Sequence, residues 1–344
     1  MTALSDACIL AASEDARIWT MARKYTMTDT ELPVAVPRQI LRSRRDNSFG
    51  YFVRRRYFLL FLALPAFVYV MIVGVGPLAR GAWYSLFDYN LQRPARTRFA
   101  GLDNYITVFT DQSSLLAIYN TFLFTIVGVT VQLILGFGIA LLLWRDDRFN
   151  RTCLAFLLIP ATITPLVVGL IFKGLLGADY GMVGHLLANA GIGPEGGLLS
   201  DGRTALWVLI AIDCWEWTPL MALILLAGLK ALPVDVLEAA RADGATATQR
   251  FARIILPLML PSVFLALILR VMDAFRVFDT VFVTTGGGPG DATQTLMLLA
   301  VKEGLSFFNI GYASAIGNVT IAFIAIMASI LVLAVRRTDV RING

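Results

Sequence analysis

Ionisable side chains interrupt one of the apolar stretches in the last third of the chain. They follow one another at intervals of three residues: Arg270, Asp273, Arg276 and Asp279. Consecutive members lie about 60° apart on a helix, so each arginine can reach an aspartate, although the ends of the series face opposite sides. A lipid-facing charge at mid-bilayer costs roughly 2.5–3.5 kcal/mol on insertion scales, so these side chains must pair, line water, or do both. Two interpretations stay open: a polar wall of a translocation path with Arg270 deepest, or ion pairs between helices that fix the bundle.

A second group of polar and aromatic side chains lies in an earlier apolar stretch. Trp215 and Trp217 flank Glu216, and Asp213 comes one turn before them. Indole rings stack on the C–H faces of sugars and carboxylates accept hydrogen bonds from hydroxyls, so these residue types suit a carbohydrate path. The competing interpretation is that tryptophans in the outer third of a span anchor the helix at the membrane interface. The candidate pathway residues are Asp213, Trp215, Glu216, Trp217, Arg270, Asp273 and Arg276.

The cysteines and the histidine are not spaced as in a metal site or a disulfide framework. Cys8, Cys153 and Cys214 lie far apart, and two of them fall in or beside apolar stretches, where cysteine acts as a small apolar side chain. His185, the only histidine, has no metal-ligand neighbours in sequence. We therefore expect no catalytic residue, no metal site and no cofactor bound by this chain.

The elements that must position these residues are membrane helices. Apolar residues make up 57% of the 344 and charged residues only 15%, which excludes a soluble globular domain. Stretches of about 20 mostly apolar residues can cross roughly 30 Å of hydrocarbon at 1.5 Å per residue. Six such spans are predicted, at about 57–79, 118–143, 153–175, 205–227, 258–283 and 313–335. Pro160 and Pro165 should kink the third.

The lysines and arginines that flank these spans predict their orientation. Sixteen lie on one side and six on the other, and the richer side is expected to be cytoplasmic. It carries both termini and the loop 230–257, whereas the four arginines within 80–98 fall on the poorer side. The net charge of +5 is therefore a topology signal, and no nucleic-acid partner is implied.

Two tails complete the domain organisation. Residues 1–56 are polar and are expected to form a partly disordered cytoplasmic tail without a cleavable signal peptide, the start being Met1, Met21 or Met27. Residues 336–344 are expected to form a short cytoplasmic tail after a single transmembrane domain over 57–335.

The loop 230–257 has the signals of a helix–turn–helix. Pro233 suits the first turn of a helix, and Gly244 suits the left-handed position that closes it. Thr246 and Gln249 have capping-box spacing for a second helix that runs to Pro257. The loop is either a docking element for another protein or an ordinary amphipathic hairpin on the membrane surface.

Small and acidic side chains in this loop favour docking. Ala239 and Ala240 present almost no side chain, so another backbone can approach them closely. Asp243 lies near the end of the first helix, where a carboxylate is unfavourable by roughly 0.3–1 kcal/mol, which suggests a partner for it.

The spacing of this loop resembles a known signature. The loop of ABC importer permease subunits is similar to it at every defined position. The pattern here is Glu238-Ala239-Ala240, then Gly244 after three residues, Ile254 after nine more, and Leu256-Pro257 after one more. In that family the loop fits a cleft on the ATP-hydrolysing subunit, and the resemblance assigns Glu238, Ala239, Ala240 and Gly244 to this contact, with Asp243 beside them. Further segments resemble the carbohydrate-uptake branch: Gly101–Tyr105, Asn120-Thr121, Leu226–Leu229, Asp243–Ala245, Thr285–Pro289 and Gly311–Ala315.

The resemblance implies an all-α, type I importer permease fold with six transmembrane helices and a cytoplasmic helix–turn–helix coupling loop. It implies a multi-pass protein of the bacterial inner membrane that works by alternating access. Its partners would be a second homologous permease, two copies of an ATP-binding subunit and an extracytoplasmic solute-binding protein. The substrate would be a mono- or oligosaccharide, a sugar alcohol or a glycerol phosphate-type solute. ATP and Mg would be used by the partner, since Gly286–Gly290 lacks the lysine of a nucleotide-binding loop.

Two other functions remain open from the sequence. In an ion-coupled secondary transporter, Arg270, Asp273 and Glu216 would form the coupling relay. An importer of the same architecture could instead carry amino acids or peptides.

Overall fold

The computed structural model describes residues 61–177, 181–191, 194 and 197–343. The predicted tail over 1–56 lies outside these residues. The chain divides into two units, Met1–Met71 and Ile72–Gly344, and the following concerns the second except where the first helix is named.

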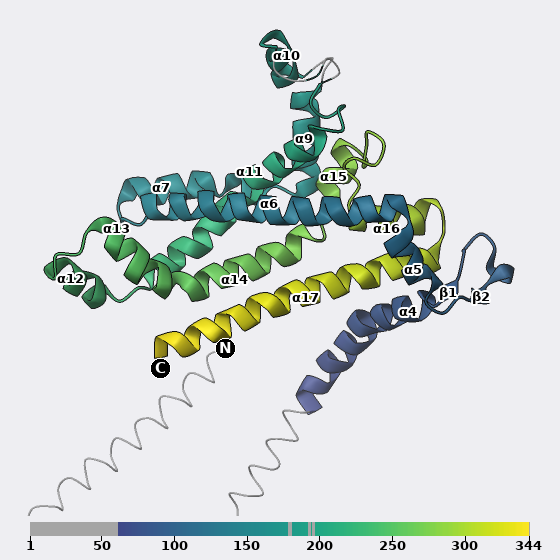
Figure 1. Cartoon of the computed structure of the whole chain (residues 1–344), viewed down its shortest axis with the longest axis horizontal. Coiled ribbons are helices and arrows are strands. Elements are labelled where there is room, and N and C mark those ends of the chain that lie inside the picture. The colour runs from purple at the N-terminus through teal and green to yellow at the C-terminus, as the bar shows by residue number, and fades with distance from the viewer. Residues whose placement is uncertain (1–60, 178–180, 192–193, 195–196, 344) are drawn as a thin grey trace, which may run out of the picture. The chain divides into compact units, whose positions relative to one another are not determined.

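Helices make up almost all of the described structure, as predicted for an all-α membrane protein (Figure 1). The α-helices are α4 (Gly76–Tyr84), α5 (Asp103–Thr110), α6 (Gln112–Leu142), α7 (Arg148–Leu157), α8 (Ile159–Thr162), α9 (Pro165–Leu176), α10 (Met182–Asn189), α11 (Ala205–Lys230), α12 (Val234–Ala242), α13 (Ala247–Arg250), α14 (Leu256–Ala274), α15 (Asp279–Thr284), α16 (Leu296–Val301) and α17 (Ile310–Asn343). Three π-helical segments, Val70–Val75, Phe251–Ile255 and Lys302–Ser306, and one 3-10 turn, Pro94–Arg96, join them. α17 continues through the backbone of residues 336–343, where a tail was predicted.

Five helical stretches of the described chain are long and apolar enough to cross a membrane. They are Phe61–Tyr84, Gln112–Leu142, Ala205–Lys230, Ala247–Thr284 and Ile310–Val335. The predicted third span, 153–175, is not one helix but falls within α7, α8 and α9. The cause is the pair of prolines: Thr164, directly before Pro165, has the extended backbone (ψ 140°) that a following proline imposes. The predicted kink is therefore a complete break.

α6 and α11 form the closest helix pair of the core. α6 begins where the Asp111 carboxylate accepts a hydrogen bond from the Ser114 N–H, and its apolar surface extends all round. Gly136 faces α11 so closely that a Cβ there would lie 2.9 Å from Met221 Cγ and 3.1 Å from Ala222 N. Small residues of this kind let membrane helices approach and gain van der Waals contact.

A short hairpin links the N-terminal and C-terminal parts of this unit. β1 (Phe87–Asp88) pairs antiparallel with β2 (Arg98–Phe99), and the Asp88 carboxylate accepts a hydrogen bond of 3.0 Å from Arg98 Nε. Asn90 then forms a β-bridge with Asn309, just before α17. α4 and α17 are thereby fastened together at one end.

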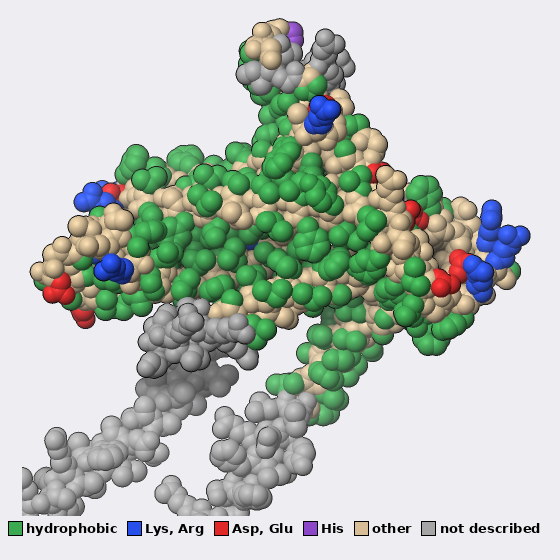
Figure 2. All heavy atoms as spheres, in the orientation of Figure 1, with side chains coloured by type: hydrophobic (Ala, Val, Ile, Leu, Met, Phe, Trp, Pro, Cys, Tyr) green, Lys and Arg blue, Asp and Glu red, His purple; other side chains and the backbone are tan. Residues whose placement is uncertain are grey.

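Apolar side chains cover much of the molecular surface. In Figure 2 they spread over α6 and α14, while charged side chains gather around α12 and α13 and around the hairpin. In the helix Phe61–Tyr84 none of the membrane-spanning window is buried. Such a surface suits lipid or another apolar helix rather than water.

Candidate functional site

Arg270 is the centre of a buried polar network that joins three helices. Its side chain, on α14, is only 4% exposed. Its Nη2 donates to Asp213 Oδ2 of α11 at 2.6 Å, and its Nη1 donates to Asp273 Oδ2 at 2.5 Å. The remaining donor, Nε, bonds to Gln132 Oε1 of α6 at 2.7 Å. The guanidinium is thus neutralised and its three nitrogens are engaged, so Arg270 is held in place and offers little to a passing solute.

Two further groups complete this network. Gln132 also donates from Nε2 to Asp213 Oδ2 at 2.7 Å, so two of the three partners of Arg270 bind each other. Trp217 places its ring 5.0 Å from the Arg270 guanidinium carbon, a cation–π contact. Of these residues only Gln132 was not predicted. The available signal was an amide side chain four residues before Gly136, on the α6 face that packs against α11.

The predicted series of four charges does not lie on one helix. α14 ends at Ala274, Arg276 lies in the following turn, and Asp279 begins α15. The Arg270–Asp273 pair is present, but Arg276 Nη2 is 3.9 Å from Asp273 Oδ1 and its Nε bonds to the Met272 carbonyl. Arg270–Asp273 is therefore a short pair, Arg276–Asp273 is a long one, and Asp279 belongs to a separate helix.

The end of α14 instead borders a small polar cavity of about 70 Å³. Its lining includes Asp213, Trp217, Asp273, Arg276 and Asp279. A water molecule needs about 10–15 Å³ of such volume, so the cavity has room for about five waters. It has room for a few water molecules but is too small for a whole sugar ring.

Glu216 and Trp215, neighbours in sequence, lie in different surroundings. Glu216 is 1% exposed, and its Oε1 has no hydrogen-bond partner among the described residues. Trp215 is 45% exposed and meets Phe172 of α9 edge-on, with ring centroids 5.3 Å apart. Of the two, only Trp215 is open to a solute.

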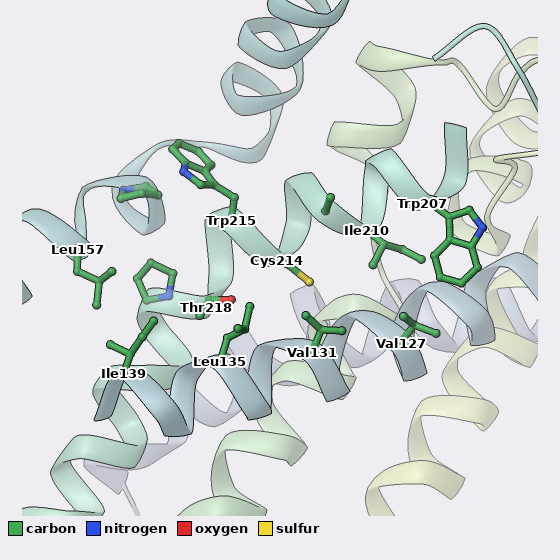
Figure 3. Close-up of a pocket in the computed structure, with 13 residues that line it drawn as sticks. Val127, Val131, Leu135, Ile139, Leu157, Trp207, Ile210, Cys214, Trp215 and Thr218 are labelled. Carbon is green, nitrogen blue, oxygen red and sulfur yellow. The ribbon is translucent and has the colours of Figure 1, made fainter. Parts of the chain in front are cut away.

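Trp215 borders a cavity of about 650 Å³ between α6, α11 and the α7–α8 junction (Figure 3). Val127, Val131, Leu135 and Ile139 contribute one face of α6 at intervals of four residues. The other lining residues are Leu157, Pro160, Trp207, Ile210, Ala211, Cys214, Trp215, Thr218 and Pro219. None of them is charged, and the volume lies in the range of sites that hold small molecules.

The loop 230–257 forms two helices around a left-handed glycine. Gly244 has φ +76°, and its N–H donates to the Arg241 carbonyl while the Ala245 N–H donates to the Ala240 carbonyl. These two bonds make a Schellman motif, which satisfies the last carbonyls of α12. The predicted left-handed glycine is confirmed.

α13 then starts from the predicted capping box. The Thr246 N–H donates to Gln249 Oε1 at 2.9 Å, and the Gln249 N–H donates to Thr246 Oγ1 at 3.3 Å. The chain continues through Phe251–Ile255 into α14. From Ala247 to Ala274 the chain is therefore one nearly continuous helical stretch, which leads from the loop to Arg270.

The residues expected to contact a partner are not all on one surface. Glu238, Ala239, Asp243 and Gly244 are exposed, whereas Ala240 is buried within its own chain. Within the described ranges, no ion pair involves Asp243, so no intramolecular partner for it was found.

A surface ion cluster lies beside this loop. Asp146, after α6, accepts hydrogen bonds from Arg151 at 3.0 and 3.2 Å and lies 3.5 Å from Lys230 Nζ at the end of α11. The hydrogen bond and the charge of Arg151, with Lys230 adding to them, lower the pKa of the Asp146 carboxyl from its usual 3.8. The α6–α7 turn is thus tied to the base of the 230–257 loop.

Comparison with known proteins agrees with this architecture. The family described as binding-protein-dependent transport system inner membrane component matches residues 132–340. A trehalose/maltose transport system permease protein of Thermococcus litoralis is 35% identical over 73% of this chain and 83% of its own length. A sulfoquinovosyl glycerol transport system permease protein of Agrobacterium fabrum is 33% identical over 81% of this chain and 90% of its own.

A trehalose transport system permease protein of Mycobacterium tuberculosis is 32% identical, over 79% of this chain and 86% of its own. Among solved structures, a chain of a bacterial ABC transporter for the acidic polysaccharide alginate shares the fold. Its TM-score is 0.69 at 20% identity, over 86% of this chain and 99% of that one. The family match covers more than half of the sequence and includes the 230–257 loop and the Arg270 network, so the chain belongs to the binding-protein-dependent transport system inner membrane components, the permease subunits of ABC transporters.

Proposed function

We propose that this chain is one half of the membrane pore of an ATP-driven saccharide importer. The main support for this proposal is the exposed α12–Gly244–α13 element. A Schellman motif and a capping box fix its conformation, and it leads directly into α14. Relatives named as permeases for trehalose, maltose or sulfoquinovosyl glycerol support a saccharide as the solute.

In this proposal the exposed loop residues dock on a separate ATPase. Glu238, Ala239, Asp243 and Gly244 would meet a cleft of that subunit, while Ala240 packs inside and sets the position of α12. Two ATPase copies, a second homologous permease and an extracytoplasmic binding protein would complete the importer. ATP and Mg would act on the ATPase, and this chain would have no catalytic role of its own.

The proposed orientation places the loop, both termini and the Asp146 cluster in the cytoplasm. The excess of lysine and arginine on that side supports it. The substrate path would then follow Trp215 and the large cavity, with the small polar cavity at Asp273 and Arg276 beside it. Asp213, Trp217 and Arg270 would act as its fixed support, since they bind one another, and Glu216 would be buried behind them.

A substitution on α12 tests the docking proposal. Ala239→Trp places a large side chain on the proposed contact, and Val234→Trp is a matched control on the same helix, about 140° around it and also exposed. In a reconstituted transporter with its ATPase and binding protein, we expect Ala239→Trp to lose saccharide-stimulated ATP hydrolysis and co-purification of the ATPase. Val234→Trp should retain both. Equal behaviour of the two variants would contradict docking at this face.

An ion-coupled secondary transporter would behave differently in the same reconstituted system. A secondary transporter would carry out uptake as a single chain driven by an ion gradient, without any ATPase. In an importer of amino acids or peptides, those solutes rather than saccharides would stimulate ATP hydrolysis.

A further inference from the structure

The four arginines around the β1–β2 hairpin are not explained by the proposed function. They lie on the side of the membrane where the charge rule expects few cations. Arg80 precedes the hairpin, Arg93 and Arg96 lie between its strands, Arg98 is on β2, and all four are exposed. Arg98 pairs with Asp88, but no ion pair in the described part of the chain involves the other three. Their charges are therefore available to a partner outside this chain.

The hairpin is held at the level where membrane helices end. β1 begins at Phe87, three residues after the membrane-spanning stretch Phe61–Tyr84. The Leu91 N–H donates to the Phe308 carbonyl at 2.9 Å, two residues before α17 begins. The headgroup region of a bilayer extends about 5–7 Å beyond the hydrocarbon on each side. The base of the hairpin therefore lies in this layer.

Aromatic rings are grouped at the base of the hairpin. Trp83 and Phe99 are both mostly exposed. The ring of Phe87 lies between them, with its centroid 5.4 Å from that of Trp83 and 5.5 Å from that of Phe99. Aromatic side chains, tryptophan above all, are enriched where the hydrocarbon meets the headgroups. This group is therefore placed as a membrane-interface anchor.

α5 adds an apolar stripe next to these rings. Leu102, Ile106 and Phe109 follow one another at intervals of four and three residues, so they share one face of the helix, and each is at least half exposed. Val108, on the opposite face, is fully buried and fixes α5 to the protein. The eight residues of α5 span about 12 Å, too little to cross a membrane. A short helix with such a stripe lies in the plane of the interface.

Cations and apolar side chains thus occur together at one end of the molecule. Figure 2 shows basic side chains projecting from the hairpin beside hydrophobic ones. Guanidinium groups match phosphate oxygens with paired hydrogen bonds, and their aliphatic stems can lie along apolar surface. An acidic protein would match the cations but leave the rings and the stripe uncovered in the headgroup layer, whereas an anionic phospholipid matches both.

We propose that the hairpin and α5 form a binding surface for anionic phospholipids. Arg93 and Arg96 contact the lipid phosphate, while Phe99 and the stripe of α5 enter the boundary of the acyl chains. The proposal goes beyond the proposed function, because it does not depend on the solute that the chain carries.

The test uses the complete transporter in nanodiscs of phosphatidylcholine and phosphatidylglycerol. In separate samples one of the two lipids carries a photoactivatable acyl chain, and mass spectrometry measures the labelling of residues 87–110 by each. The ratio of the two yields is the preference for anionic lipid. Arg93→Gln combined with Arg96→Gln removes two charges, and the corresponding pair of lysine substitutions is the charge-conserving control. Ile106→Asn interrupts the stripe, and Thr107→Asn is its control, because Thr107 is also exposed but lies off the stripe.

An arginine at the membrane surface strengthens the binding of anionic lipid by about 5-fold. We therefore expect the glutamine pair to lower the preference for phosphatidylglycerol by about 5- to 25-fold and the lysine pair to lower it by less than about 3-fold. Ile106→Asn should reduce labelling by both lipids, and Thr107→Asn should leave it unchanged.

Three results would overturn the proposal. One is equal labelling of the natural chain by the two lipids, or an unchanged preference in the glutamine pair. Another is loss of the preference on adding inorganic phosphate but not chloride at the same ionic strength, which would assign the arginines to a free phosphate. The third is loss of binding-protein docking in the glutamine pair with lipid labelling intact, which would assign them to that protein. Each of these leaves the importer assignment unaffected.

Discussion

Asp213 of α11 and Arg270 of α14 form an ion pair of 2.6 Å in which the side chains are only 9% and 4% exposed. Their neighbours Gln132 and Asp273 fill the remaining positions around the guanidinium. A pair so completely enclosed fixes the relative position of three helices, because separating them would leave unpaired charge in an apolar interior.

Removing one partner of the Asp213–Arg270 pair should therefore lower the free energy of unfolding. We expect Arg270→Met to destabilise the chain by about 3–5 kcal/mol, since it leaves Asp213 buried without its cation. Arg276→Met is the control, because its side chain is 63% exposed and its ion pair is long, and it should cost less than about 1 kcal/mol. Thermal or denaturant unfolding of the purified protein in detergent measures both. Similar midpoints for the two variants would show that the buried pair is not structural.

Two glycines of α6 that are separated by a single residue should respond differently to alanine. A Cβ at Gly136 would collide with Met221 and the backbone of Ala222, whereas a Cβ at Gly138 meets nothing within 4 Å. We expect Gly136→Ala to lower stability by about 1–3 kcal/mol through overpacking. Gly138→Ala should be neutral or slightly stabilising, because alanine favours the helix. The same unfolding assay compares them, and a stable Gly136→Ala protein would contradict the close α6–α11 contact.

The backbone of Gly244 offers a test of how the loop works. Proline cannot adopt φ +76°, so Gly244→Pro should abolish transport and uncouple ATP hydrolysis while the membrane helices still insert. Asparagine tolerates the left-handed region, so Gly244→Asn should keep most of the activity. Uptake and ATP hydrolysis in proteoliposomes give the readout. Normal uptake by the proline variant would refute the role of this turn.

The Asp146 cluster should be insensitive to pH in the physiological range. Its carboxyl has a pKa below 3.8 because Arg151 and Lys230 stabilise the ionised form. A lowered pKa contributes stability that is present above the unfolded-state value and is lost only as the pH falls through the folded-state value. We expect any stability difference between the natural chain and Asp146→Asn to be constant between about pH 5 and 8 and to vanish only below about pH 4. A difference that changes near neutral pH would assign the titration to another group.

The 230–257 loop was predictable because its geometry follows from local rules. Gly244 in a left-handed conformation and the Thr246–Gln249 box both involve residues within a few positions of each other. The Arg270–Asp273 pair is likewise a contact at i, i+3. These features can be read from spacing alone.

The remaining parts of the site depend on contacts that spacing does not encode. Gln132 and Arg270 are 138 residues apart, and nothing local indicates that α6 and α14 meet at that level. The end of α14 at Ala274 has no proline or glycine to signal it, so the spacing alone placed Arg276 and Asp279 on the same helix as Arg270. By contrast, Pro160 and Pro165 did signal an interruption, and only its extent was underestimated.

The gap between α8 and α9 has a consequence for biogenesis. Ile163 and Thr164 have extended backbones, so the Ile163 carbonyl and the Thr164 N–H lie outside the helical hydrogen-bond ladder at a point flanked by apolar helices. Lipid cannot supply hydrogen bonds to such groups, and irregular backbone at that depth is tolerated only against protein or trapped water. We therefore expect a newly synthesised copy without its companion subunits to be a target for membrane proteolysis. The cellular abundance of this chain should then follow the supply of its scarcest companion rather than its own rate of translation.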